Sequence, residues 1–126
     1  MMTWTVAVAI AVGGAVGAPL RHLIDTRVTG SLSTERARRF PWGLLVVNVT
    51  GSLLIGVAYV IAEGPWRELL ATGACGALTT YSSYALFLQR SWRTDRAAAW
   101  WALAVMPVTC IAAVGIGISA ARVVLA

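Results

Sequence analysis

The sequence predicts an all-α membrane protein with four closely packed transmembrane helices, and two observations carry this prediction. Of the 126 residues, 59% are hydrophobic and only 12% are charged, and the mean hydropathy is +0.77. A chain of this length cannot enclose so much apolar surface in one small soluble core, so it needs lipid as its solvent. The apolar residues also gather in four long runs, with the polar residues concentrated between them.

Each run is long enough to cross the hydrocarbon core of a bilayer, which takes about 20 helical residues. The predicted spans are roughly Trp4 to Ile24, Pro41 to Ala62, Leu69 to Leu88 and Ala97 to Leu125. Short connections make neighbouring helices antiparallel, so we expect residues 1–126 to form one up-down bundle. No positive charge precedes the first run, so we interpret it as a retained span instead of a cleaved signal.

All ten basic residues are arginine, and their distribution predicts an orientation. In a four-span chain the first and third connections share one face of the membrane. That face holds eight arginines against two opposite: Arg21, Arg27, Arg36, Arg38, Arg39, Arg90, Arg93 and Arg96, against Arg67 and Arg122. The bias predicts that both termini lie outside the cytoplasm. A nucleic-acid partner is not expected, because the arginines flank apolar runs and form no soluble basic face.

Polar residues inside the spans are the candidates for function, because buried polar groups in lipid must be satisfied and they gather along pathways. Asn48 lies near the middle of the second span, where its amide could join two helices or donate to an anion. Arg21 has Asp25 four residues on, which favours a structural ion pair at a helix end, or a snorkelling side chain, over direct contact with an ion. Thr109 lies within the fourth span.

The third run predicts a helix that breaks in the membrane. Gly73 and Gly76 are followed by Thr79-Thr80-Tyr81-Ser82-Ser83-Tyr84, in which hydroxyl groups and two aromatic rings crowd into six positions. We expect free carbonyls and hydroxyls at this break to line a polar path or to coordinate a cation. Tyr81 and Tyr84 are three residues apart and face the same way, and their mid-span position argues against a role as interfacial anchors.

Three segments together resemble the Fluc/CrcB family of fluoride channels. They are Gly13 to His22, with its glycines followed by Arg21; Trp42 to Ser52, around Asn48; and Gly73 to Tyr84, at the expected break. The resemblance implies four-helix subunits that assemble as antiparallel dimers with two pores in the bacterial plasma membrane. It also implies passive export of fluoride.

Residue by residue, the resemblance implies that Asn48 helps to coordinate fluoride. Tyr81 and Tyr84 would occupy paired pore-lining positions where the family normally has Phe. Hydroxyls of Thr80, Ser83 and Thr109 would continue the polar track. A structural sodium ion would be held at the dimer centre by the backbone carbonyls of Gly76 and Thr79 from each subunit.

Several alternatives stay open. The tyrosines allow a non-conducting, structural subunit, since their added hydroxyls could block the pathway. A small drug or cation exporter is less favoured, because none of the five acidic residues lies mid-span. The uneven arginine count predicts one fixed orientation and a separately encoded, oppositely oriented paralogue as dimer partner, with a second copy of the chain as the alternative. No nucleophile and base or cofactor loop is present, so no enzyme is expected.

Overall fold

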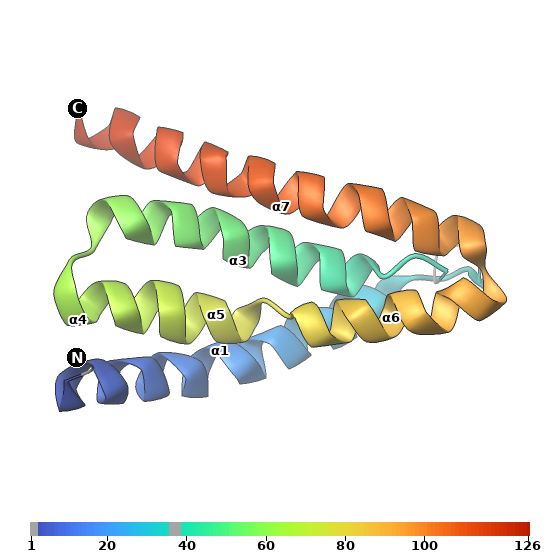
Figure 1. The fold of residues 1–126 in the computed structure, drawn as a ribbon, viewed down its shortest axis with the longest axis horizontal. Helices are drawn as coiled ribbons and strands as arrows, with labels where there is room; N and C mark the ends of the chain where they lie inside the picture. Colours follow the sequence, from blue (N-terminus) through green and yellow to red (C-terminus); the bar gives the residue numbers. More distant parts are fainter. Residues whose placement is uncertain (1–2, 36–38) are drawn as a thin grey trace.

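The computed structural model describes residues 3–35 and 39–126, and its regular elements there are all helical. Three of the helices are long: α1 (Trp4–Ser31), α3 (Trp42–Ile61) and α7 (Arg96–Leu125). Between α3 and α7 the chain forms α4 (Gly64–Arg67), the π-helical stretch η1 (Glu68–Cys75), α5 (Gly76–Leu78) and α6 (Tyr81–Thr94). Figure 1 shows these segments running alongside one another, with both termini at the same end.

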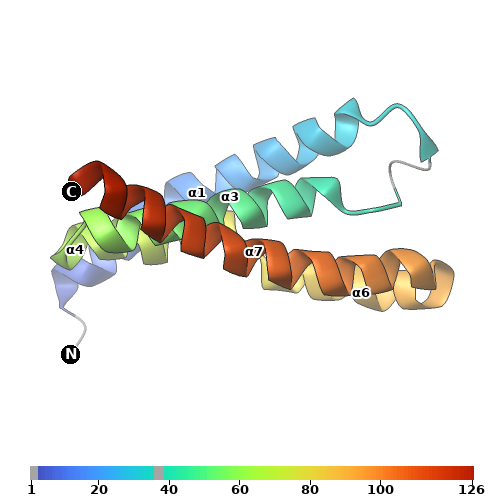
Figure 2. The ribbon, with the colours of Figure 1, turned by 90° about the horizontal axis from the view of Figure 1, so that it is seen from above.

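In the described part of the chain, α1, α3 and α7 are the helices long and apolar enough to cross a membrane. The predicted second and fourth spans agree with α3 and α7 to within a residue at each end. The first differs, because α1 continues past the predicted end at Ile24 as far as Ser31. Hydropathy indicates where an apolar run ends, and a helix can continue beyond that point. Figure 2 shows the C-terminal end of α1 diverging from α6 and α7.

Side-chain caps determine where the helices begin. The Thr3 hydroxyl accepts from the Val6 amide at 3.4 Å at the start of α1, and Asp95 accepts from the Ala98 amide at 3.1 Å at the start of α7. Such caps satisfy amides that have no partner within the helix. Because Asp95 alone separates α6 from α7, this cap also sets the sharp turn between them.

Glycines let the helices pack backbone to backbone. A Cβ atom on Gly17 of α1 would overlap the carbonyl oxygen of Ala74 in η1. A Cβ atom on Gly117 of α7 would likewise overlap the carbonyl oxygen of Leu53 in α3. Small residues at such crossings allow the close van der Waals contact that holds helices together where no hydrophobic effect drives them. The bundle is therefore built from two tight pairs, α1 with η1 and α3 with α7.

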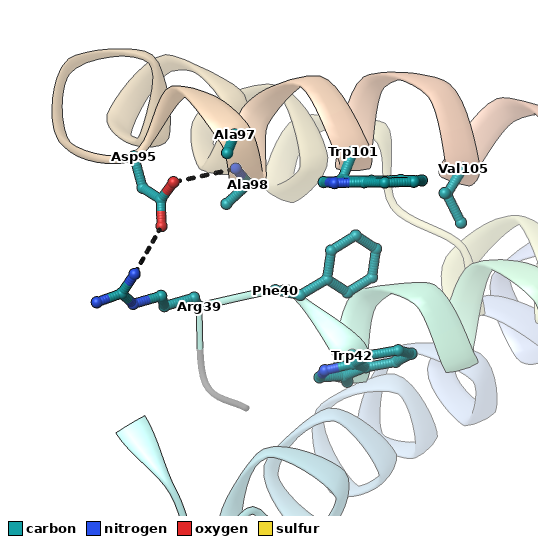
Figure 3. Close-up of a pocket in the computed structure, with 8 residues that line it drawn as sticks. All are labelled: Arg39, Phe40, Trp42, Asp95, Ala97, Ala98, Trp101 and Val105. Atoms are coloured by element: carbon teal, nitrogen blue, oxygen red, sulfur yellow. Dashed lines mark hydrogen bonds and ion pairs between the residues drawn. The ribbon is translucent and has the colours of Figure 1, made fainter. Parts of the chain in front are cut away.

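The two connections that the sequence predicts on one face of the membrane meet at one end of the bundle, although Arg90 and Arg93 belong to α6 and Arg96 begins α7. Arg39, in the connection before α3, lies 3.8 Å from the carboxylate of Asp95, in the connection before α7 (Figure 3). Phe40, Trp42 and Trp101 line a cavity of 450 Å³ beside this ion pair. Aromatic rings of this kind are typical of the membrane interface. Arg36 and Arg38, which contribute to the predicted charge bias, lie outside the described residues.

The packing of α1 predicts that two neighbouring glycines respond differently to the same substitution. Gly17→Ala should destabilise the protein by about 1 to 3 kcal/mol, because the new methyl group meets backbone that cannot move aside. Gly14→Ala is the matched control, since a Cβ atom there has nothing within 4 Å. Thermal unfolding in detergent measures both, and equal midpoints for the two variants would contradict the packing.

A candidate ion site at the helix break

The helical segment between α3 and α7 is interrupted at Thr79 and Thr80. Thr79 has φ −76° and ψ 155°, and Thr80 has φ −148° and ψ 116°, so both are extended. The interruption lies near the middle of the segment from Gly64 to Thr94 and is visible in Figure 1 as the thin link between α5 and α6. The predicted break is confirmed, and it falls within the hydroxyl-rich run.

Asn48 of α3 pairs with both backbone groups of Thr80. The Thr80 amide donates to Oδ1 of Asn48 at 2.7 Å, and Nδ2 of Asn48 donates to the Thr80 carbonyl at 3.2 Å. An extended residue points its amide and its carbonyl to the same side, so one carboxamide serves both, as a neighbouring β-strand would. Asn48 is only 6% exposed. The carboxamide therefore substitutes for the helical hydrogen bonds that Thr80 has given up.

This pairing changes the hydrogen bonding of two carbonyls at the break. In an unbroken helix the amide of Thr80 would donate to the carbonyl of Gly76, and the amide of Ser83 to the carbonyl of Thr79. The Thr80 amide donates to Asn48 instead, and the Ser83 amide donates to the Thr80 hydroxyl at 3.3 Å. The carbonyls of Gly76 and Thr79 thus lack their usual helical donors. The hydroxyl of Thr79 donates to the Gly76 carbonyl at 3.3 Å in place of the Thr80 amide.

A cavity of 320 Å³ opens beside the break, bounded by α3, α6 and α7. Its lining comprises Asn48, Ser52, Ile55, Thr79, Thr80, Tyr81, Tyr84, Met106, Pro107 and Cys110. The polar groups come from α3, from the break and from the two tyrosines of α6, whereas α7 contributes only a thioether, a proline ring and a thiol. None of the described residues that line this cavity carries a full charge.

The structure brings together four of the six residues predicted along the pathway: Asn48, Thr80, Tyr81 and Tyr84 line the cavity. Ser83 lies outside the lining and contacts the Thr80 hydroxyl at 3.1 Å, so it supports the cap of α6. Thr109 is also outside the lining, and its hydroxyl donates to the carbonyl of Val105 in its own helix at 2.7 Å.

Sequence reasoning did not single out Ser52, Met106 or Cys110 as lining residues. Ser52 follows Asn48 by one helical turn, so the spacing of four residues contained enough information to find it. Met106 and Cys110 share the same spacing on α7, but neither residue type marks a polar pathway.

The two tyrosines have different surroundings. Tyr84 is 7% exposed, and its hydroxyl donates to the carbonyl of Ala102 in α7 at 3.4 Å. Tyr81 is 81% exposed in the single chain. Their ring centroids lie 6.1 Å apart at an interplanar angle of 61°, an edge-to-face arrangement. The extra hydroxyl of Tyr84 is thus directed to a neighbouring helix.

Arg21 lies apart from this site. It is half-buried within α1, well before the end of that helix at Ser31. Asp25 accepts a hydrogen bond from the hydroxyl of Thr29 at 3.4 Å. Within residues 3–35 and 39–126 no ion pair joins Arg21 to Asp25, because α1 continues and the carboxylate of Asp25 contacts Thr29, one helical turn further along.

An apolar helical chain that surrounds an uncharged polar cavity with a broken helix has the features of a membrane channel or transporter. The model of the CrcB-like protein, Camphor Resistance (CrcB) family matches residues 8–119. The chain therefore belongs to the CrcB family, whose members are multi-pass membrane channels and not enzymes.

Curated relatives agree with this assignment, and each of the following is described as a fluoride-specific ion channel. The chain is 37% identical over 123 residues to the relative from Hahella chejuensis, which covers 92% of this chain and 94% of the relative. It is 44% identical over 92 residues to the one from Aeromonas salmonicida, covering 68% of each. For the relative from Rhodospirillum rubrum, 36% identity over 85 residues covers 61% of this chain and 63% of the relative.

The pairing of Asn48 with Thr80 predicts an ordered set of stabilities. Asn48→Leu leaves both Thr80 groups buried without partners and should destabilise the fold by about 1 to 3 kcal/mol for each group. Asn48→Gln keeps both a donor and an acceptor on a side chain one methylene longer, so it should fall between wild type and Asn48→Leu. Unfolding in detergent measures the order, and a variant Asn48→Leu as stable as wild type would contradict the pairing.

Proposed function

We propose that the chain is a subunit of a fluoride-selective channel that exports fluoride passively across the bacterial plasma membrane. The observation that carries the proposal is the carboxamide of Asn48 beside a helix break, in a cavity lined by paired aromatic rings. Relatives that match 92% and 68% of the chain are described as fluoride-specific ion channels, which supports the choice of ion.

The chemistry of the cavity suits a small anion. Fluoride is strongly hydrated, so a selective path must replace its water with closely spaced donors in a passage too narrow for larger anions. Amide, hydroxyl and aromatic-edge groups meet this need without the tight binding that a full positive charge would cause. The amino-terminal end of α6 also begins at the break, and its helix dipole favours negative charge there.

The broken segment supplies the fourth crossing in this proposal. Its two halves, from Gly64 to Leu78 and from Tyr81 to Thr94, run alongside the three long helices in Figures 1 and 2. Non-helical backbone at membrane depth is tolerated where it is buried in protein or lines a cavity, and the Thr80 backbone meets that condition. Residues 1–126 then form one transmembrane domain.

Dimerisation would cover groups that a single chain leaves open. Gly76, whose carbonyl lacks its helical donor, is exposed, and Tyr81 is 81% exposed. In the proposed channel both lie at mid-depth, where it is costly to expose polar groups to lipid. An antiparallel partner would bury both. It would also add a second pair of carbonyls to those of Gly76 and Thr79, and unwound carbonyls of this kind coordinate sodium in other membrane proteins. The arginine bias favours an oppositely oriented paralogue as that partner, with a second copy of the chain as the alternative.

A non-conducting, structural subunit is the second candidate, and the lining of α7 favours it. Met106, Pro107 and Cys110 offer no strong hydrogen-bond donor to an anion that moves along this helix. In that case the pore formed by a partner's residues would carry the ion.

Fluoride efflux from liposomes tests the channel proposal. The chain, alone or with an oppositely oriented paralogue from the same genome, should release fluoride and retain chloride. Asn48→Asp should abolish release through its own pathway, because a carboxylate there repels the anion. Ser82→Ala is the control, since Ser82 is exposed and outside the cavity lining.

Each outcome of this experiment is informative. Release that needs the paralogue supports the fixed orientation, and release by the chain alone supports a homodimer. Release that needs the paralogue and is unchanged with Asn48→Asp would assign the structural role instead. Folded protein that passes no fluoride in either combination would refute the proposal.

A further inference from the structure

We propose that the Met106 sulfur accepts from the amide of Asn48 when no fluoride is bound, that fluoride displaces it, and that this competition sets the affinity of the site for the ion. This inference rests on the proposed function and adds a residue to its site that determines affinity. It follows from how the two hydrogens of one amide group are shared.

The Asn48 amide has two N–H groups, and they have partners of unequal strength. One donates to the Thr80 carbonyl at 3.2 Å, and the Met106 sulfur lies 3.7 Å from the same nitrogen. A thioether is a weak hydrogen-bond acceptor. The bond to Thr80 is therefore the stronger one, and the second N–H group keeps most of its capacity to donate.

Met106 can move aside while the break stays intact. It is 3% exposed and lines the same cavity as Asn48, but from α7. An unbranched thioether has three rotatable bonds and adapts to irregular space, so the sulfur can leave without a shift of the backbone. The Oδ1 and Nδ2 bonds to Thr80 involve other atoms and remain.

The carboxamide of Asn48 thus has two separate tasks. Its bonds to Thr80 stabilise the break, and its second N–H group is available to an anion that replaces the sulfur. Fluoride is a much stronger acceptor than a thioether, so the exchange favours the ion without leaving a buried donor unpaired. Conduction requires binding weak enough for release, and competition from the sulfur contributes to this.

Two substitutions at this position should shift fluoride affinity in opposite directions. Met106→Leu keeps a similar volume and removes the competing acceptor, so the half-saturating fluoride concentration should fall about 2- to 10-fold, the range that one net hydrogen bond gives. Met106→Gln places a strong acceptor on a side chain of similar length, so this concentration should rise by a similar factor. A role in packing alone would not produce opposite signs.

The experiment measures fluoride efflux against fluoride concentration for the full chain in whichever assembly conducts. Val108→Ala is the control, because it changes α7 close to Met106 at a side chain that is exposed and lies outside the cavity lining, and its half-saturating concentration should stay at the wild-type value. Equal or same-sign shifts for the two Met106 variants would overturn the inference while leaving the proposed function intact. A wild-type protein without fluoride efflux would overturn both.

Thermal unfolding in detergent would reveal a Met106 variant that fails to fold. A second measurement, on the wild-type protein, tests the inference without any variant. In the wild-type protein the side-chain amide signal of Asn48 in nitrogen-15 NMR should move on addition of sodium fluoride and not of sodium chloride. The methyl signal of Met106 should move with it. A fluoride response at Asn48 with Met106 unchanged would contradict displacement of the sulfur.

Discussion

The structure depends on one pairing across the bundle, between the carboxamide of Asn48 and the backbone of Thr80, residues separated by 32 positions in the chain. A helix break inside a membrane exposes amides and carbonyls that lipid cannot satisfy, at a cost of several kcal/mol each. Asn48 satisfies one of each with a single side chain. The pairing therefore stabilises an extended residue in the middle of the segment from Gly64 to Thr94, and it ties α3 to the centre of that segment.

The break in turn creates two regions of opposite polarity within a few residues. On the α5 side the carbonyls of Gly76 and Thr79 lack their helical donors, which suits a cation. On the α6 side the amino-terminal amides and the helix dipole suit an anion. In the proposed dimer a sodium site and a fluoride path can therefore lie next to each other. Both would be formed by uncharged groups.

Much of the fold could be predicted from the sequence, because spans follow from hydropathy and the break follows from the run Thr79 to Tyr84. The extension of α1 to Ser31 could not, since polar residues outside lipid continue a helix as easily as they end one. The partners of Asn48 also depend on tertiary structure, so the sequence left structural and anion-binding roles open. The sequence contained no indication of the proposed role of Met106 in fluoride affinity, because that role depends on the contact of its sulfur with Nδ2 of Asn48.

Amide hydrogen exchange at Thr80 tests the central claim most directly. Thr80 lies outside any helix, so only the bond to Oδ1 of Asn48 can protect its amide among the bonds described here. The account predicts slow exchange at Thr80 in the wild-type protein and fast exchange in Asn48→Ala, with the Val47 amide in α3 protected in both. Fast exchange at Thr80 in the wild-type protein would contradict it.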